Sequence, residues 1–178
     1  PCSLGAQDLF WEKSGPYTGE ISLDMLKEFD VTHVLVGHSD RRYKIGETDE
    51  VINKKIKAAL EAGITPVLLI GERNRGDTRK QIIETQLSAD LAGLTAEQIL
   101  KVLITYEPVW AISTTPGASS STTFGTKVVL GKPDTPANTL EALAVIQEFL
   151  LASYQLPATS YQLLYGGSVN ADNVADFL

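Results

Sequence analysis

The stretch "TDEVINKKIKAALEAGITPVLLIGE", residues 48–72, decides the fold because it joins an amphipathic helix directly to a buried strand. In 48–63 the apolar side chains recur with a helical period, and Gly63 stands where such a helix would end. Residues 65–72 are apolar on both faces up to Gly71, which is typical of strands inside a parallel sheet. The stretch therefore predicts one strand-helix unit of a parallel α/β protein.

The same alternation of short apolar runs and helix-period segments continues in both directions along the chain. Strands are expected over 4–11, 32–38, 65–72, 102–110 and 161–168. Helices are expected over 22–29, 48–63 and 79–93, in a short turn capped by Thr95 and Gln98, from Thr135-Pro136 onward, and from Asn170 onward. Residues 126–131 are expected to form a small hairpin or edge strand. Five strand-helix units fit either an open doubly wound sheet or part of an eight-stranded barrel.

Composition predicts one globular domain, since 43% of the 178 residues are hydrophobic and 21% are charged. A net charge of −7 without clustered Lys or Arg argues against a nucleic-acid surface. No apolar run approaches the roughly 20 residues of a membrane span, and no signal-peptide pattern follows Pro1, so a soluble, cytoplasmic protein without a membrane partner is expected. The single Cys2 cannot form an internal disulfide, and no metal site is expected.

Polar residues gather where each expected strand gives way to its loop. The groups are Trp11-Glu12-Lys13, Gly37-His38-Ser39, Gly71-Glu72, Tyr106-Glu107 and Gly166-Gly167-Ser168. In a barrel the carboxyl ends of all strands meet on one rim, where barrel enzymes carry their catalytic groups. The pattern therefore favours a barrel with a site on that rim.

Glu107 is the strongest candidate for a catalytic group in this set. It lies between Tyr106 and the stiff pair Pro108-Val109, so its carboxylate would stand in a partly apolar environment. Such an environment raises a carboxyl pKa toward the range that a general base acting on carbon needs. From spacing alone, a surface glutamate beside a proline explains the residue equally well.

His38 is the second candidate. A histidine at a strand terminus can polarise a carbonyl or carry protons, or it can simply hydrogen-bond a loop. His33, near the other end of the same strand and on its opposite face, is given only a structural role. The turn at 165–169, "YGGSV", would place free backbone N–H groups where a phosphate could bind, although a Gly-Gly-Ser turn alone is a weak signal.

Five motifs, taken in order, carry a resemblance that covers nearly the whole chain apart from two loops: "WEKSGPYTGEIS", "VGHSDRR", "GETDEVINKK", "YEPVWAI" and "LYGGSV". In this order they strongly resemble the triosephosphate isomerase family. The resemblance implies a TIM (β/α)8 barrel of which five strand-helix units, the third to the seventh, are present, so that 1–178 form a single incomplete barrel domain. It also implies a cofactor-independent isomerase of glycolysis and gluconeogenesis, which interconverts D-glyceraldehyde 3-phosphate and dihydroxyacetone phosphate through an enediolate.

By the same resemblance, Glu107 is the base and His38, kept neutral, is the electrophile. Ser39 would contact the base in its open position, and Arg41 and Glu47 would hold the loop after His38 in place. Asp40 replaces the glutamate that usually follows "HS" in the family, and Leu69 stands where a cysteine is common.

The resemblance also assigns a mobile lid that closes over the substrate. Its hinge would be Pro108, Val109 and Trp110, its phosphate contacts would come from backbone N–H groups near Ser113 and Ser168, and Tyr165 and Ser168 would latch it. Here the lid, 113–135, is 23 residues long, longer than the family's pattern, and position 113 is serine rather than glycine. The loop "GERNRGDTRKQ" also departs from the family's pattern.

The loop "SGPYTGEIS", 14–22, resembles the segment that inserts Thr18 into a neighbouring subunit in this family, which implies a homodimer. Tyr17 and Glu20 would anchor it. A plain Gly/Pro surface loop is the alternative.

No counterpart of the family's first two strands, with their Asn-x-Lys segment, precedes Pro1, and no eighth strand follows Leu178. Five strands cannot close a barrel built for eight, so we expect these residues to be the central part of a longer chain. Two alternatives to the triose isomerase stay open: an isomerase of four-carbon erythrulose phosphate, and a non-catalytic fragment or scaffold.

Overall fold

The computed structural model describes residues 2–112, 119–123, 126–130 and 134–177. Its main sheet is parallel, in the order β1-β2-β3-β4-β7. The strands of this sheet are β1 (Gly5–Ala6), β2 (His33–Val36), β3 (Thr65–Ile70), β4 (Leu103–Tyr106) and β7 (Leu163–Tyr165). The connecting helices are α1 (Leu23–Lys27), α2 (Asp49–Ala62), α3 (Arg79–Asp90), α4 (Ala96–Ile99) and α5 (Pro136–Tyr154).

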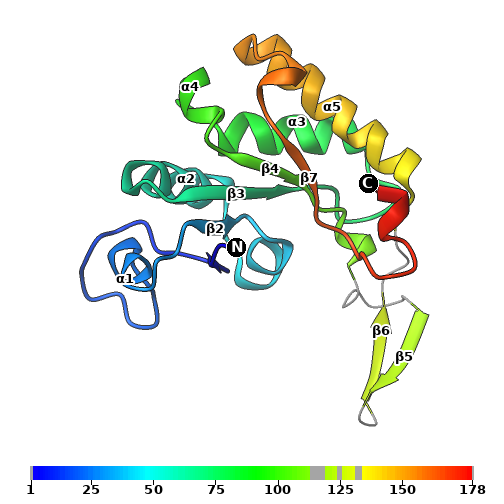
Figure 1. Ribbon diagram of the computed structural model, residues 1–178, viewed down its shortest axis with the longest axis horizontal. Coiled ribbons are helices and arrows are strands. Elements are labelled where there is room, and N and C mark those ends of the chain that lie inside the picture. The colour runs from blue at the N-terminus through cyan, green and yellow to red at the C-terminus, as the bar shows by residue number, and fades with distance from the viewer. Residues whose placement is uncertain (1, 113–118, 124–125, 131–133, 178) are drawn as a thin grey trace.

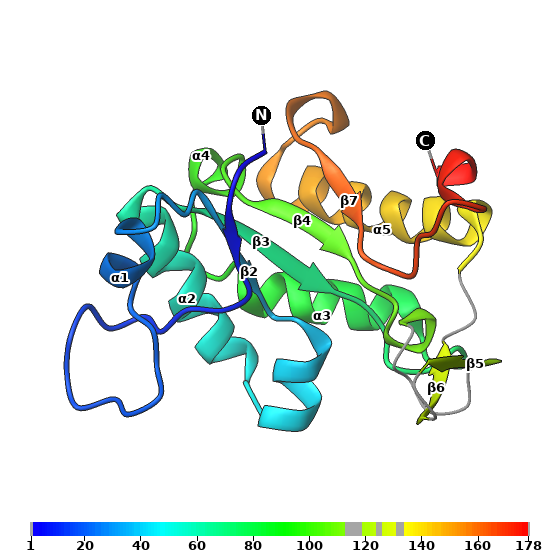
Figure 2. The ribbon, with the colours of Figure 1, turned by 60° about the horizontal axis from the view of Figure 1, so that its bottom comes forward.

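The strand order decides between the two architectures that the sequence left open. The five strands lie side by side in the same order in which they occur along the chain. The strand order therefore never reverses as it does in a doubly wound sheet. Figure 2 shows α2, α3 and α5 together behind the strands, on one face of the sheet. Helices on one face of an unreversed parallel sheet are the arrangement of a (β/α)8 barrel, of which this sheet is a part.

The core lies between that face of the sheet and the helices. Alternate strand residues point into it: Val34, Val36, Leu68, Ile70, Ile104 and Tyr106 are each at most 2% exposed. The helices contribute residues at helical spacing, namely Ile52, Ile56 and Ala59 from α2, Ile83 and Leu87 from α3, and Ala142, Ile146 and Leu150 from α5. The intervening strand residues Leu35, Val67 and Leu103 are only partly buried, and Leu164 is exposed.

The helix caps expected at Thr95, Thr135 and Gly63 are confirmed. The side chain of Thr135 accepts a hydrogen bond from the backbone at the start of α5, which Pro136 opens, and Thr48 caps α2 in the same way without having been singled out. Thr95 and Gln98 form a reciprocal capping box at α4. Gly63 ends α2 with φ at 74°, in the left-handed region where glycine carries no steric penalty.

Several expected elements differ. The strand expected over 161–168 is limited to Leu163–Tyr165. The strand expected over 4–11 is confined to Gly5–Ala6, with an isolated bridge from Phe10 to Ser22. The strand expected over 102–110 ends at Tyr106, because Pro108 has no N–H for the ladder and the chain turns into a 3₁₀ turn over Val109–Ala111.

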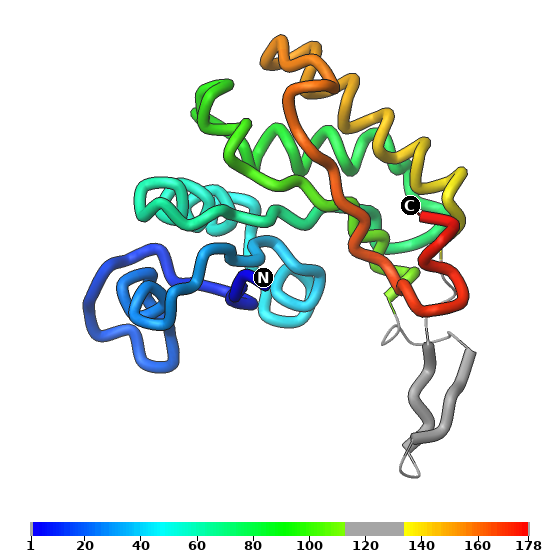
Figure 3. Tube along the Cα trace, in the orientation of Figure 1, coloured from blue at the N-terminus to red at the C-terminus, as the bar shows by residue number. Residues whose placement is uncertain are grey.

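No α-helix begins at Asn170. The Asn170 side chain instead accepts hydrogen bonds from the backbone N–H groups of Asp172 and Asn173, which competes with helical pairing, and a 3₁₀ turn follows over Val174–Phe177. Figures 1 and 3 show this last turn beside the N-terminal end of α5.

The expected hairpin is confirmed. β5 (Ser119–Thr123) and β6 (Thr126–Leu130) pair antiparallel in a separate two-stranded sheet, with Ser121 opposite Val128. This hairpin occupies much of the segment 113–135 that the sequence marks as an enlarged loop.

Candidate active site

The carboxyl ends of the parallel strands bring the expected polar groups to one rim. The sheet pairing extends past the strand ends, since the N–H of Glu107 donates to Ile70 O at 2.7 Å and the N–H of Gly166 donates to Tyr106 O at 2.8 Å. Glu107 is thereby fixed between the ends of β3 and β7, while His38 and Ser39 follow β2.

Glu107 and His38 form a direct pair, with His38 Nε2 3.1 Å from Glu107 Oε1. The other carboxylate oxygen, Oε2, accepts a hydrogen bond of 2.9 Å from the backbone N–H of Ser39. Glu107 is only 3% exposed, whereas 28% of the His38 side chain is exposed. The carboxylate is therefore enclosed by protein, and the imidazole forms its open side.

The backbone fixes the tautomer of His38. The N–H of Asp40 donates to His38 Nδ1 at 3.1 Å, so Nδ1 acts as an acceptor. The ring proton of the neutral imidazole then lies on Nε2, the nitrogen that faces Glu107. His38 consequently presents an N–H donor at the rim.

Burial raises the pKa of Glu107 from its ordinary value of 4.5 to about 7. Hydrogen bonds from the backbone and side chain of Ser39, together with the positive charge of Arg42, act in the opposite direction, and Asp40 raises the pKa further. A carboxyl group with a pKa about 7 can both accept and release a proton near neutral pH, as a general base must.

Two glycines allow the chain to approach Glu107 closely. A β-carbon on Gly71 would lie 2.3 Å from the carbonyl oxygen of Glu107. A β-carbon on Gly166 would lie 2.8 Å from Thr105 Cγ2 and 3.5 Å from Glu107 Cβ. The backbone after β3 and β7 can therefore pack around Glu107 only because these positions have no side chain.

The three residues expected as a hinge, Pro108, Val109 and Trp110, come directly after Glu107 in the chain. Of these, Trp110 is anchored to Glu72. Glu72 is 2% exposed, and its Oε1 accepts hydrogen bonds from Tyr106 Oη at 2.8 Å and Trp110 Nε1 at 3.0 Å. The N–H of Val109 donates to the carbonyl of Glu72 at 3.1 Å, and Arg79 Nε lies 3.4 Å from Glu72 Oε1. The sequence marked Glu72 only by its place at a strand end, and nothing in its spacing connects it with Trp110.

Arg41 and Glu47, which the sequence paired, do lie together. Arg41 Nη2 is 2.6 Å from Glu47 Oε1 and 3.0 Å from Asp8 Oδ2. Lys55, 1% exposed, contacts Glu47 and reaches Asp8 Oδ1 at 2.5 Å. Burial acts to raise the pKa of Glu47, but hydrogen bonds from Arg41 and Lys55 outweigh it and lower that pKa. Sequence reasoning missed Lys55 because it occupies the buried side of α2, where an apolar residue is the norm.

Arg42 is a further residue that the sequence did not single out. Its guanidinium donates to the carbonyl of Gly37 at 2.7 Å and that of Leu69 at 3.1 Å, and it pairs with Asp90 at 2.6 Å and Asp49 at 2.5 Å. The side chain is 6% exposed. Arg42 therefore ties the turn before His38 to the end of β3 and to α3.

The other expected site residues are distributed as follows. The ring of Tyr165 stacks on Phe177 with centroids 4.5 Å apart, and the N–H of Ser168 donates to the carbonyl of Ala111 at 3.3 Å, next to the residues expected as a hinge. Ser113 lies outside the described residues. His33 Nδ1 lies 2.7 Å from Thr32 Oγ1, at the opposite end of β2 from His38.

The loop that carries Tyr17, Thr18 and Glu20 projects beside α1, at the left of Figure 1. All three residues are exposed, and the Tyr17 ring packs back on Phe10 with centroids 4.4 Å apart. This loop is thus held in shape from within, while its outer side faces solvent.

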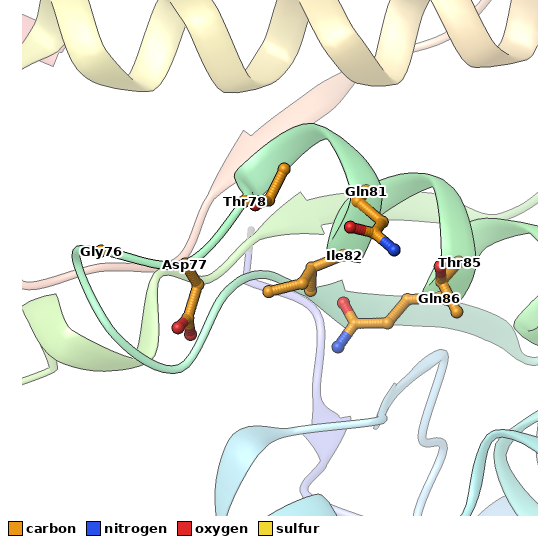
Figure 4. A pocket seen from close by; sticks show the side chains of 7 residues that line it. All are labelled: Gly76, Asp77, Thr78, Gln81, Ile82, Thr85 and Gln86. Atoms are coloured by element: carbon orange, nitrogen blue, oxygen red, sulfur yellow. The ribbon is translucent and has the colours of Figure 1, made fainter.

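A separate hollow of about 670 Å³ lies along the start of α3 (Figure 4). It is lined by Gly76, Asp77, Thr78, Gln81, Ile82, Thr85 and Gln86. Gln86 connects it with the rim, since its Oε1 accepts a hydrogen bond of 2.9 Å from the N–H of Gly71.

Within residues 2–112, 119–123, 126–130 and 134–177, no three His, Cys, Asp or Glu side chains are grouped so that they could hold a metal ion. Within the same ranges, no helix combines the length and apolar character needed to cross a bilayer.

Fold and rim together define a parallel α/β chain of the barrel class that carries a buried carboxyl group paired with a partly exposed imidazole at the carboxyl ends of its strands. A family model described as "Triosephosphate isomerase" matches residues 1–178. The chain belongs to the triosephosphate isomerase family.

Curated relatives carry the same name. The triosephosphate isomerase of Citrifermentans bemidjiense is 42% identical over 177 residues, which cover 97% of this chain and 64% of the relative. Those of Endomicrobium trichonymphae and Dictyoglomus thermophilum are each 41% identical, over 99% and 98% of this chain and 65% and 66% of the relatives. The chain thus spans slightly less than two thirds of the length of these relatives.

Proposed function

We propose that the protein is an aldose-ketose isomerase that interconverts D-glyceraldehyde 3-phosphate and dihydroxyacetone phosphate. The observation that carries the proposal is the pair at the rim: Glu107 Oε1 lies 3.1 Å from His38 Nε2, with Glu107 buried and its pKa raised to about 7. The name shared by the relatives supports the choice of substrate. A cytoplasmic location, where glycolysis and gluconeogenesis take place, follows from the proposal.

In the proposed reaction Glu107 removes a proton from the carbon next to the substrate's carbonyl group. The electron pair of that C–H bond forms the enediolate, whose oxygen accepts a hydrogen bond from the Nε2–H of His38. Glu107 then returns the proton to the former carbonyl carbon, while the hydroxyl proton of the carbon that was deprotonated passes to the former carbonyl oxygen, so that the hydroxyl becomes the new carbonyl group. Substrate and product are isomers, so the atoms and electrons balance without an oxidant or reductant.

The surrounding residues would hold this pair in place. Ser39 binds the carboxylate of Glu107, and Arg41 with Glu47 braces the loop that follows His38. Backbone N–H groups near Ser113 and at Ser168 would bind the phosphate, and the segment 113–135 would close over it, turning on Pro108, Val109 and Trp110 and latched by Tyr165 and Ser168.

A homodimer is part of the same proposal. The projecting loop would insert Thr18 into the neighbouring subunit, with Tyr17 and Glu20 as anchoring groups. The exposure of all three residues supports this assignment. Residues 1–178 would then belong to one barrel domain.

The test is the rate of isomerisation by the intact protein on three-carbon and four-carbon sugar phosphates. We expect faster turnover of glyceraldehyde 3-phosphate, and loss of turnover in Glu107→Gln with the substrate still bound. Glu61→Gln, an exposed glutamate on α2, is the matched control and should retain activity. A preference for erythrulose phosphate would transfer the assignment to the four-carbon reaction. Absence of turnover on both substrates would leave a non-catalytic protein.

A further inference from the structure

The loop between β3 and α3 places two arginines over aromatic rings. Arg75 Cζ lies 4.1 Å from the centroid of the Trp110 ring, and Arg73 Cζ lies 5.0 Å from that of Tyr43. Both distances are within the range in which a guanidinium is attracted to the face of an aromatic ring. The two contacts differ in their target: Trp110 is three residues beyond Glu107, whereas Tyr43 lies in the helical turn over Arg41–Ile45.

Trp110 is consequently held by two side chains of the segment that follows β3, Glu72 and Arg75. Its Nε1 donates to Glu72 Oε1 at 3.0 Å, and its ring carries the Arg75 guanidinium. Glu72 and Arg75 together form a clamp on the indole. Glu72 is buried and also accepts a hydrogen bond from the Tyr106 hydroxyl, so this end of the clamp is fixed to the sheet. Arg75 is exposed and supplies the side of the clamp that faces solvent.

The clamp acts on the stretch that follows Glu107. The N–H of Val109 donates to Glu72 O, and the carbonyl of Ala111 accepts from the N–H of Ser168, so the backbone on both sides of Trp110 is also tied to neighbouring strand ends. The indole is in addition held by the charged side chain of a loop residue, Arg75.

We infer that Arg75 is a positioning residue: by stacking on Trp110 it fixes the indole against Glu72, and thereby the backbone that leads out of Glu107. The inference rests on the proposed function for its effect on turnover, but the fixing of Trp110 itself is a property of the fold. Arg75 lies in the loop "GERNRGDTRKQ", which departs from the family's pattern.

The chain offers a direct probe, because Trp11 and Trp110 are its two tryptophans. In a background in which Trp11 and any tryptophan outside residues 1–178 are replaced by Phe, the fluorescence of the intact protein reports on Trp110 alone. Arg75→Gln should make the indole about twofold more accessible to acrylamide quenching and shift its emission to longer wavelength, because the ring loses its cover. Arg75→Lys keeps the cation and should restore part of the protection.

Arg73→Gln is the matched control, since it removes the same charge from the same loop but stacks on Tyr43. It should leave the quenching of Trp110 unchanged. Equal quenching in Arg75→Gln, Arg73→Gln and the parent would overturn the inference. Circular dichroism of each variant establishes that the fold is retained.

Turnover supplies the second measurement. We expect kcat to fall about threefold or more in Arg75→Gln with KM changed less than about twofold, because Glu107 is less well positioned while the phosphate contacts remain. If quenching increases in Arg75→Gln but kcat is unchanged, the inference that Arg75 positions Glu107 is overturned. If the parent itself shows no isomerase activity, the proposed function fails, and the quenching comparison still decides whether Arg75 holds Trp110.

Discussion

Gly71 and Glu107 are in such close contact that a β-carbon on Gly71 would stand 2.3 Å from the Glu107 carbonyl oxygen. The N–H of Glu107 meanwhile donates to Ile70 O, and the N–H of Gly71 donates to the buried side chain of Gln86. The ends of β3 and β4 are thereby locked at Glu107, the proposed base. Neither backbone can move aside without breaking these hydrogen bonds.

Gly71→Ala should therefore destabilise the protein and reduce activity together. We expect a loss of roughly 2 kcal/mol in the free energy of unfolding, the usual cost of forcing an extra methyl group into a packed interior. Urea denaturation measures it. Gly76→Ala is the control, because a β-carbon there meets nothing within 4 Å. Equal stability of the two variants would show that the contact is not rigid.

The pKa of Glu107 predicts how stability depends on pH. Because burial raises this pKa from 4.5 to about 7, the folded state keeps its proton where the unfolded state has already released it. The stabilisation from this group is complete below pH 4.5 and is lost as the pH rises through about 7. The difference between the two pKa values corresponds to roughly 3 kcal/mol.

Glu107→Gln should remove this dependence and make the variant more stable than the parent at pH 8. Denaturation curves measured between pH 5 and pH 8 test it. Asp90, whose pKa burial raises to about 7 despite the charge of Arg42, contributes a second decline of the same sign, which should remain in Glu107→Gln. A parent and variant with parallel pH profiles would contradict the raised pKa of Glu107.

Two adjacent lysines on α2 allow a buried ion pair to be compared with an exposed one. Lys55→Met leaves the carboxylates of Glu47 and Asp8 without their buried cation and should cost roughly 3 kcal/mol of unfolding free energy. Lys54→Met removes an exposed pair with Glu50 and a contact of Lys54 Nζ with the Trp11 ring, 5.7 Å from its centroid, and should change stability by about 1 kcal/mol or less. Thermal denaturation of the two variants compares them directly. Similar losses would show that Lys55 is not held as the structure describes.

The sequence predicts the fold well because the signals for it are local. Thr48, Gly63, Thr95 and Thr135 each mark a helix end through a hydrogen bond or a backbone angle that only a few neighbouring residues determine. Asn170 misled the prediction for a similar reason, since the side chain that can cap a helix can also close a turn.

The site was only partly predictable. Glu107 and His38 stand out because each closes an apolar strand, and parallel pairing brings such ends together. The partners Glu72 and Trp110, and the clamp of Arg42 on Gly37 and Leu69, depend on side chains that reach across strands. No period or spacing in a single sequence encodes those contacts.

The central claim is that Glu107 moves a proton at carbon. The most direct test follows, by NMR in D₂O, the entry of solvent deuterium into dihydroxyacetone phosphate incubated with the intact protein. We predict that the parent protein incorporates deuterium at the carbon that loses its proton, and that Glu107→Gln binds the substrate yet incorporates none. Exchange in Glu107→Gln at a rate within about tenfold of the parent would contradict the account, because an amide in place of the carboxylate cannot serve as the base.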